Sequence, residues 1–170
     1  YRSNAQSRAI EEALLRVSIP YRIYGGLRFY ERLEIKNAIA YLRIIFNNND
    51  NPSFERSISN PTRGVGEKTL AKIRQAAKKY NISYIKASAK LIDEGSISGR
   101  GGSGLRDYLE FIAGCKSFIE DNLLSELMEL IIKESGLYAY HGKEPGEKGK
   151  TRTENLEELI TATKNFEQSI

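Results

Sequence analysis

The sequence predicts a mainly α-helical domain preceded by a short α/β segment. After residue 26, apolar residues recur at three- and four-residue spacing through most of the chain, which is typical of amphipathic helices. Before that point, one helical pattern leads into a β-branched and aromatic run, Ile19–Tyr24, which is typical of a strand. A helix followed by a single strand cannot bury itself alone. Residues 1–26 are therefore interpreted as a fragment of a larger α/β domain.

The composition indicates a globular chain without a membrane-spanning segment. Of its 170 residues, 40% are hydrophobic and 28% are charged, which is typical of a folded, soluble domain rather than a disordered segment. No apolar run approaches the roughly 20 residues that a transmembrane helix needs, and no signal peptide opens the chain. We therefore expect a cytoplasmic protein. The first residue, Tyr1 rather than Met, favours a piece of a longer one.

The cysteine and histidine content argues against a metal site. Cys115 is the single cysteine, so an internal disulfide is impossible and a reducing compartment is expected. With His141 as the single histidine, a Cys/His zinc site is not expected either. The simplest interpretation makes Cys115 a small apolar helix residue and His141 a solvated loop residue.

Stretches rich in Gly, Pro, Asn and Ser interrupt the helical periodicity and favour turns. The segments 47–52, 95–104 and 141–150 are expected to be loops. Gly136 is expected just beyond the end of a helix, where a left-handed conformation is common. The expected helices cover residues 31–46, 54–58, 66–79, 84–94, 105–119, 124–131 and 156–163.

The segment NPTRGVGEKTL, residues 60–70, invites comparison with the phosphate loop of nucleotide hydrolases. That loop requires G-x-x-x-x-G-K-[ST] after a buried strand. Here Glu67 follows Gly66, so the lysine comes one position late, and Pro61 occupies the position of the first glycine. No apolar strand precedes the segment. The sequence therefore does not predict a nucleotide-binding loop.

The turn nevertheless has features that favour binding of a phosphate. Gly64 and Gly66 can adopt positive φ without steric cost, so neighbouring N–H groups can converge on one anion. The turn leads directly into a predicted helix, whose unpaired N–H groups and dipole also favour an anion. These features suit a phosphate group, for which a DNA backbone is one source.

Positive charge is concentrated in the same region. The whole chain carries a net charge of +4, and Thr62–Tyr80 contains six basic residues and one acidic residue. At helical spacing, Lys68 and Lys72 lie opposite the apolar stripe of this segment. Two interpretations remain open at this point: a surface that binds a DNA backbone, or a solvated helix face that follows a tight turn.

Four longer segments resemble, in order and spacing, the UvrD/PcrA/Rep-type superfamily 1 DNA helicases. They are YRSNAQSRAIEEAL, IPYRIYGGLRFYERLEIKNAIAYLRII, NPTRGVGEKTL and GEKGKTRTENLEELITATKNF. The resemblance covers essentially the whole chain. Helicases of this family contain two RecA-like motor domains, 1A and 2A, and two inserted domains, 1B and 2B.

The resemblance implies a particular division of the chain. Residues 1–26 would belong to the end of domain 2A, residues 27–165 would form the helical 2B domain, and residues 166–170 would return towards 2A. Gly25 and Gly26 resemble the hinge between the two domains. The implied fold is a helical 2B-type insertion with a helix-hairpin-helix-like element, preceded by an α/β fragment of the RecA-like domain.

The resemblance also implies DNA-binding residues. In this family a Gly-Ile-Gly element of 2B contacts the backbone of double-stranded DNA, and valine replaces the isoleucine here. The matching residues are Thr62, Arg63, Gly64, Val65 and Gly66. Lys68 and Lys72 follow this element and are expected to contact DNA as well. Arg2 and Asn4 resemble residues near the path of single-stranded DNA.

The family couples ATP hydrolysis to 3′→5′ movement on single-stranded DNA and to duplex unwinding in repair and replication. Its phosphate loop, Mg²⁺ site and arginine fingers belong to parts that this sequence lacks. We therefore expect no cofactor, no metal and no ATPase activity for the chain alone, whereas the full-length helicase would use ATP and Mg²⁺.

An alternative function from another class is a protein-interaction or autoinhibitory module that swivels and has little affinity for DNA. Its partners would be repair accessory proteins or a second protomer. The mixed-charge segment 143–154 suits either function. An independent nucleotide hydrolase does not fit the sequence.

Overall fold

The computed structural model describes residues 28–169, and all regular secondary structure in this range is helical, which confirms the mainly α fold. The predicted N-terminal helix and strand, and the hinge glycines Gly25 and Gly26, lie outside the described residues. The helices are α3 (Arg28–Glu31), α4 (Leu33–Phe46), α5 (Asn51–Ile58), α6 (Glu67–Tyr80), α7 (Tyr84–Asp93), α8 (Gly99–Asp121), α9 (Leu124–Glu134), α10 (Leu137–Gly142) and α11 (Glu147–Ser169).

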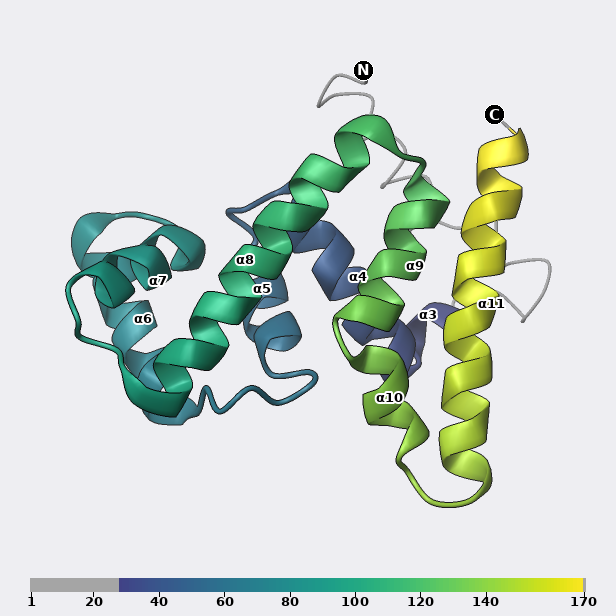
Figure 1. Cartoon of the computed structure of the whole chain (residues 1–170), viewed down its shortest axis with the longest axis horizontal. Helices are drawn as coiled ribbons and strands as arrows, with labels where there is room; N and C mark the ends of the chain where they lie inside the picture. The colour runs from purple at the N-terminus through teal and green to yellow at the C-terminus, as the bar shows by residue number, and fades with distance from the viewer. Residues whose placement is uncertain (1–27, 170) are drawn as a thin grey trace.

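The helices form two groups that the long helix α8 connects (Figure 1). At one end of the molecule α6 packs against α7. At the other end α9, α10 and α11 pack around α4, and α11 lies along the outer edge. Helix α8 contacts α7 in the first group and both α4 and α9 in the second.

Helix α4 forms the centre of the larger group because most of its surface is apolar. Ten of its 14 residues are buried, and a helix that is apolar on most sides must be surrounded by other elements. Helices α5, α8, α9, α10 and α11 surround it. Tyr41 of α4 and Tyr108 of α8 are fully buried. The hydroxyl of Tyr41 reaches the segment that joins α5 to α6, and the hydroxyl of Tyr108 reaches Ser57 in the last turn of α5.

Two features outside this centre agree with the sequence. Gly136 follows the end of α9 with φ +94°, which confirms the expected left-handed residue. Cys115 is buried on α8, and burial raises the pKa of its thiol to about 12, so the thiol is protonated and unreactive at neutral pH. Within residues 28–169, no helix has the length and apolar character required to cross a bilayer.

The expected loop at 95–104 is correct only for residues 95–98, because α8 begins at Gly99 and includes the rest of the glycine-rich segment. Glycine inside a helix costs backbone entropy, and the sequence alone therefore favours a loop. Tertiary contact explains the helix: a Cβ atom at Gly104 would lie 1.9 Å from the carbonyl oxygen of Arg63. At Gly102 it would lie 3.1 Å from the carbonyl oxygen of Ile97. Only glycine permits the approach at position 104, and a Cβ atom at position 102 would make a tight contact.

The expected loop at 141–150 is also largely wrong. Helix α10 extends to Gly142, and α11 starts at Glu147. A Cβ atom at Gly149 would lie 2.2 Å from the carbonyl oxygen of Glu144. The glycine therefore allows the first turn of α11 to pack directly against the connection from α10.

His141 is not a solvated loop residue: it lies on α10 and is fully buried. Its Nε2 atom lies 3.2 Å from Asn37 Nδ2. Because Asn37 Oδ1 accepts a hydrogen bond from Arg56 Nε (3.0 Å), the amide of Asn37 presents its NH₂ group to the histidine. Nε2 must therefore accept, so the imidazole is neutral and carries its proton on Nδ1. The error arose because the partner of His141 is 104 residues away in the sequence.

Further polar groups continue this buried network towards α11. Arg152 forms ion pairs with Glu144 and, at 3.7 Å, with Glu34. Asn155 donates to the carboxylate of Glu34 (2.7 Å) and accepts from Arg32 (2.9 Å). The network thus joins α4, at the start of the described chain, to α11 at its end.

The network predicts a stability that depends on pH through His141. Burial and, secondarily, the charge of Arg152 lower the pKa of His141 below its ordinary value of 6.5, against the opposing effect of Glu144 and Glu34. The unfolded chain therefore binds the proton more readily, so the free energy of unfolding should be constant above pH 6.5 and fall as the pH drops below it. Urea titrations between pH 5.5 and 7.5 measure this. His141→Gln should remove the dependence in that range, and an equal slope in both proteins would contradict the assignment.

Candidate nucleic-acid interface

The turn at Thr62–Gly66 connects α5 to α6 and runs along the lower edge of the molecule in Figure 1. Gly64 has φ +78° and is exposed, so it adopts the expected left-handed conformation. Gly66 does not: it is the residue before α6, with φ −100° and ψ −170°, and a Cβ atom there would meet nothing within 4 Å. A substitution at Gly66 should therefore be tolerated far better than one at Gly64. Val65 is half-buried and packs against the core.

The start of α8 lies directly against this turn. A Cβ atom at Gly101 would lie 3.3 Å from the carbonyl oxygen of Gly64, and one at Gly104 would overlap the carbonyl oxygen of Arg63. A Cβ atom at Gly64 would in turn meet the side chain of Arg100 at 3.0 Å. The turn and the first turns of α6 and α8 therefore form one continuous surface.

Two helices begin at this surface without a side-chain cap. Gly66, before α6, has no side chain that could cap the helix. Ser98, before α8, makes no capping hydrogen bond through its side chain. The first turns of helices carry N–H groups that have no partner within the helix, and the dipole adds a partial positive charge there. Glu67 is the acidic residue of the first turn of α6, but its carboxylate forms an ion pair with Arg74 (2.6 Å).

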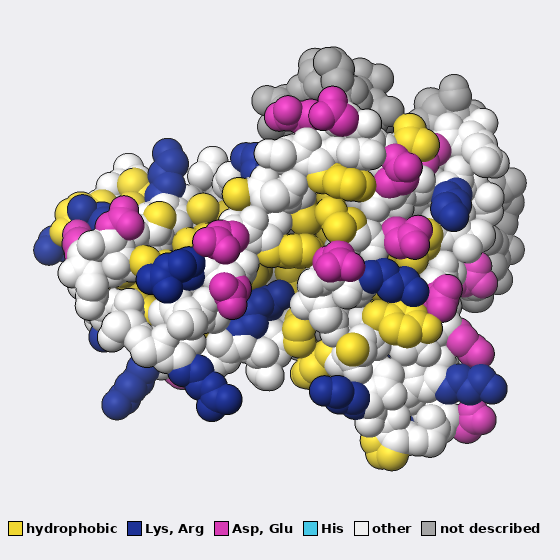
Figure 2. All heavy atoms as spheres, viewed as in Figure 1, with side chains coloured by type: hydrophobic (Ala, Val, Ile, Leu, Met, Phe, Trp, Pro, Cys, Tyr) yellow, Lys and Arg dark blue, Asp and Glu magenta, His cyan; other side chains and the backbone are white. Residues whose placement is uncertain are grey.

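Exposed lysines surround the turn and extend along α6. Lys68, Lys72, Lys78 and Lys79 are all exposed, whereas Leu70, Ile73 and Ala77 are buried, so the two faces predicted from the sequence are confirmed. Lys72 Nζ donates to the carbonyl oxygen of Ser96, before α8 (3.2 Å). Figure 2 shows Lys and Arg side chains projecting from the end of the molecule that α6 and α7 form.

Two of the six basic residues of Thr62–Tyr80, both arginines, form several hydrogen bonds within the protein. Arg74 donates to both oxygens of Glu55 on α5 (2.9 and 2.7 Å) and to Glu67, and these hydrogen bonds raise the pKa of its guanidinium. Arg63 turns inward, where its Nη1 atom donates to the carbonyl oxygens of residues 57, 58 and 61. Sequence reasoning counted both as surface charges.

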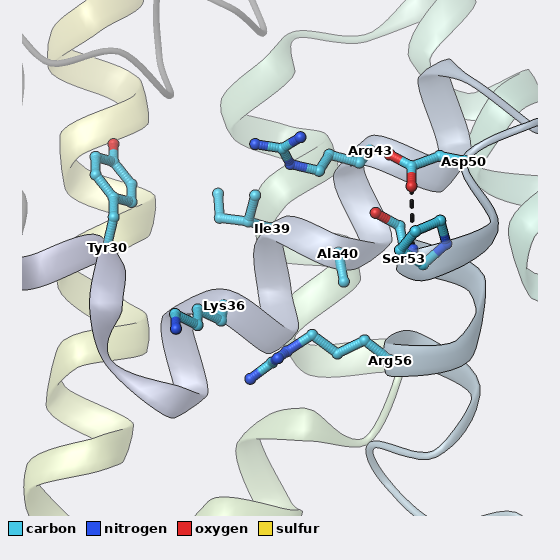
Figure 3. Close-up of a pocket in the computed structure, with 9 residues that line it drawn as sticks. Tyr30, Lys36, Ile39, Ala40, Arg43, Asp50, Ser53 and Arg56 are labelled. Carbon is cyan, nitrogen blue, oxygen red and sulfur yellow. Dashed lines mark hydrogen bonds between the residues drawn. The ribbon is translucent and has the colours of Figure 1, made fainter.

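A cationic hollow of about 550 Å³ lies between α4 and α5 (Figure 3), and the sequence did not predict it. Lys36 and Arg43 of α4 and Arg56 of α5 line it together with Tyr30. The two bases of α4 are seven residues apart, a spacing that places them on one helix face and could have indicated the hollow. Arg56 Nε is already bonded to Asn37, so the hollow has fewer donors for a ligand than its charge suggests.

The remaining predicted residues are located as follows. Thr62 is exposed beside Gly64. Arg2 and Asn4 lie outside the described residues. Among residues 28–169, no group of three or more His, Cys, Asp or Glu side chains is arranged to hold a metal ion.

Comparison with known proteins relates this architecture to helicases. Residues 1–98 match the model of the UvrD-like helicase C-terminal domain. The chain is 49% identical over 166 residues to DNA helicase II of Escherichia coli (strain K12), and the match covers 98% of this chain and 23% of that protein. It is 36% identical over 168 residues to the ATP-dependent DNA helicase PcrA of Bacillus subtilis (strain 168), covering 99% of this chain and 23% of the relative. The chain thus spans about a quarter of the length of these relatives.

Proposed function

The chain belongs to the UvrD-like DNA helicase family, and from that premise we propose that it is the duplex-binding and regulatory 2B region of an ATP-dependent 3′→5′ DNA helicase. Such a helicase would act in the cytoplasm in DNA repair or replication. ATP and Mg²⁺ would be bound by other parts of the full-length protein, so the chain alone would have no ATPase activity. Residues 1–26 would belong to domain 2A, with Arg2 and Asn4 near single-stranded DNA and Gly25–Gly26 as the hinge.

One observation carries the proposal for duplex binding. Helix α6 begins directly after the turn at Thr62–Gly66, and the first turns of α8 pack against it. Neither helix has a side-chain cap at this end, and exposed lysines lie beside the turn. Backbone N–H groups and lysines recognise phosphates, and neither is directed at base edges. The DNA backbone is therefore the ligand that this surface suits best.

The distribution of charge supports one orientation of the DNA. Residues 62–90 contain eight basic residues and one acidic residue, whereas residues 107–134 contain seven acidic residues and two basic ones. Asp and Glu side chains gather over the end of α8 and along α9 (Figure 2). A duplex would be attracted to the α6 side and repelled from the α9 side. The alternative, a protein-interaction module with little affinity for DNA, would gain support only from failure of the binding test below.

Binding of a labelled hairpin duplex should be nearly independent of sequence and should weaken steeply with salt. Lys68→Ala and Lys72→Ala should each reduce the slope of log K against log salt by roughly 0.9, because each loses about one phosphate contact. Fluorescence titrations at several salt concentrations measure both quantities. Lys164→Ala, which removes an exposed lysine from α11, is the control and should bind as the unaltered chain does. A flat salt response, or equal effects of all three substitutions, would refute the proposal.

A further inference from the structure

Arg63 is the basic residue of the turn, and its surroundings differ from those of a phosphate ligand. Its Nη1 atom lies 2.9 Å from the carbonyl oxygen of Ser57 and 3.2 Å from that of Ile58. Both carbonyl groups belong to the last turn of α5, where helix carbonyls have no partner within the helix. A third bond, of 3.1 Å, joins Nη1 to the carbonyl oxygen of Pro61. The guanidinium therefore caps the C-terminal end of α5.

The guanidinium also lies between two buried aromatic rings. Its carbon is 5.6 Å from the ring centre of Tyr41 and 5.2 Å from that of Tyr108, distances at which a cation is attracted to a ring face. Its Nη2 atom donates to the hydroxyl of Tyr41, which itself donates to the carbonyl oxygen of Asn60 (2.7 Å). The hydroxyl of Tyr108 is bonded to Ser57 Oγ (2.6 Å).

We propose that Arg63 is a positioning residue, which fixes the turn from inside and makes no contact with DNA phosphate. Both of its terminal nitrogens are occupied by groups on α4, α5 and the turn itself. These bonds direct Nη1 and Nη2 towards α4, α5 and the turn and not towards a phosphate on the exposed side. Its function is to keep Thr62 and Gly64 at the surface, with their backbone in the conformation that presents N–H groups. This inference rests on the proposed function of the turn.

The experiment compares four substitutions in the 170-residue chain: Arg63→Lys, Arg63→Ala, Tyr41→Phe and Lys68→Ala. Arg63→Lys retains the charge but loses the planar set of donors, so it should weaken duplex binding about tenfold, as expected for the loss of one or two charged hydrogen bonds. Tyr41→Phe removes a hydroxyl from a fully buried side chain and should also weaken binding. Neither should change the salt slope, whereas Lys68→Ala should reduce it by roughly 0.9. Circular dichroism and thermal unfolding check that each variant is folded.

Two results would overturn the inference. If Arg63→Lys binds as the unaltered chain does and Arg63→Ala reduces the salt slope by roughly 0.9, Arg63 is a phosphate ligand. Amide hydrogen exchange provides a test without DNA: residues 62–66 should exchange faster in Arg63→Lys and Tyr41→Phe than in the unaltered chain. Unchanged exchange in both folded variants would also refute the positioning function. If the chain binds no duplex at all, the proposed function fails. The exchange data then still test whether Arg63 positions the turn, so the two failures are distinguished.

Discussion

Replacing Gly104 with alanine is expected to separate α8 from the turn at Thr62–Gly66 and to weaken duplex binding by tenfold or more. The added Cβ atom would lie 1.9 Å from the carbonyl oxygen of Arg63 and 3.0 Å from its carbonyl carbon. Both are backbone atoms, so no side chain can rotate to make room. We expect a loss of about 1–3 kcal/mol in the free energy of unfolding, the range typical of overpacked sites.

Gly114 provides a matched control in the same helix. It is exposed, and a Cβ atom there would meet nothing within 4 Å. Gly114→Ala should therefore stabilise the chain by about 0.5–1 kcal/mol through the higher helix propensity of alanine. Urea unfolding and duplex titration of both variants test the pair. If Gly104→Ala were as stable as Gly114→Ala and bound duplex normally, the close contact between α8 and the turn would be wrong.

The same glycines show why the sequence predicted some elements and missed others. The apolar stripes that predicted helices at 31–46, 66–79 and 84–94 are local patterns, and α4, α6 and α7 confirm them. The segment 95–104 has no such local signal. Its glycines reduce helix propensity, and the contact with the carbonyl oxygen of Arg63 that explains them joins residues about 40 positions apart. A long-range contact of this kind cannot be inferred from periodicity.

The candidate site was predictable in outline but not in detail. The glycines and lysines of residues 62–72 were sufficient to predict a turn that leads into a helix with exposed lysines, and anion binding at this turn stays a prediction. The direction of each charged side chain was not, because it depends on partners on other helices. Glu55 holds Arg74, and Tyr41 and Tyr108 hold Arg63. Likewise, nothing near residue 141 indicated that Asn37 would bury its imidazole.

Among the charged residues described above, Arg152 is the one whose loss is expected to lower the free energy of unfolding most. Arg152 is the ion-pair partner of both Glu34 and Glu144. The side chain of Glu34 is only 4% exposed, and without Arg152 this buried carboxylate would keep the hydrogen bond from Asn155 but lose its ion pair. Arg152→Ala should therefore reduce the free energy of unfolding by about 3 kcal/mol. Because Glu34 is on α4 and Arg152 on α11, it should also loosen the contact between the two ends of the helical domain.

Lys148→Ala is the matched control, because Lys148 also pairs with Glu144, at 3.6 Å, but its side chain is 64% exposed. Exposed ion pairs contribute about 0–1 kcal/mol, so this substitution should have little effect. Urea unfolding at pH 7.5 measures both variants, and hydrogen exchange along α4 and α11 reports whether the two helices separate. A small and equal effect of the two substitutions would mean that the buried network does not hold these helices together. A large effect confined to Arg152→Ala, with faster exchange in both helices, is the result that the geometry predicts.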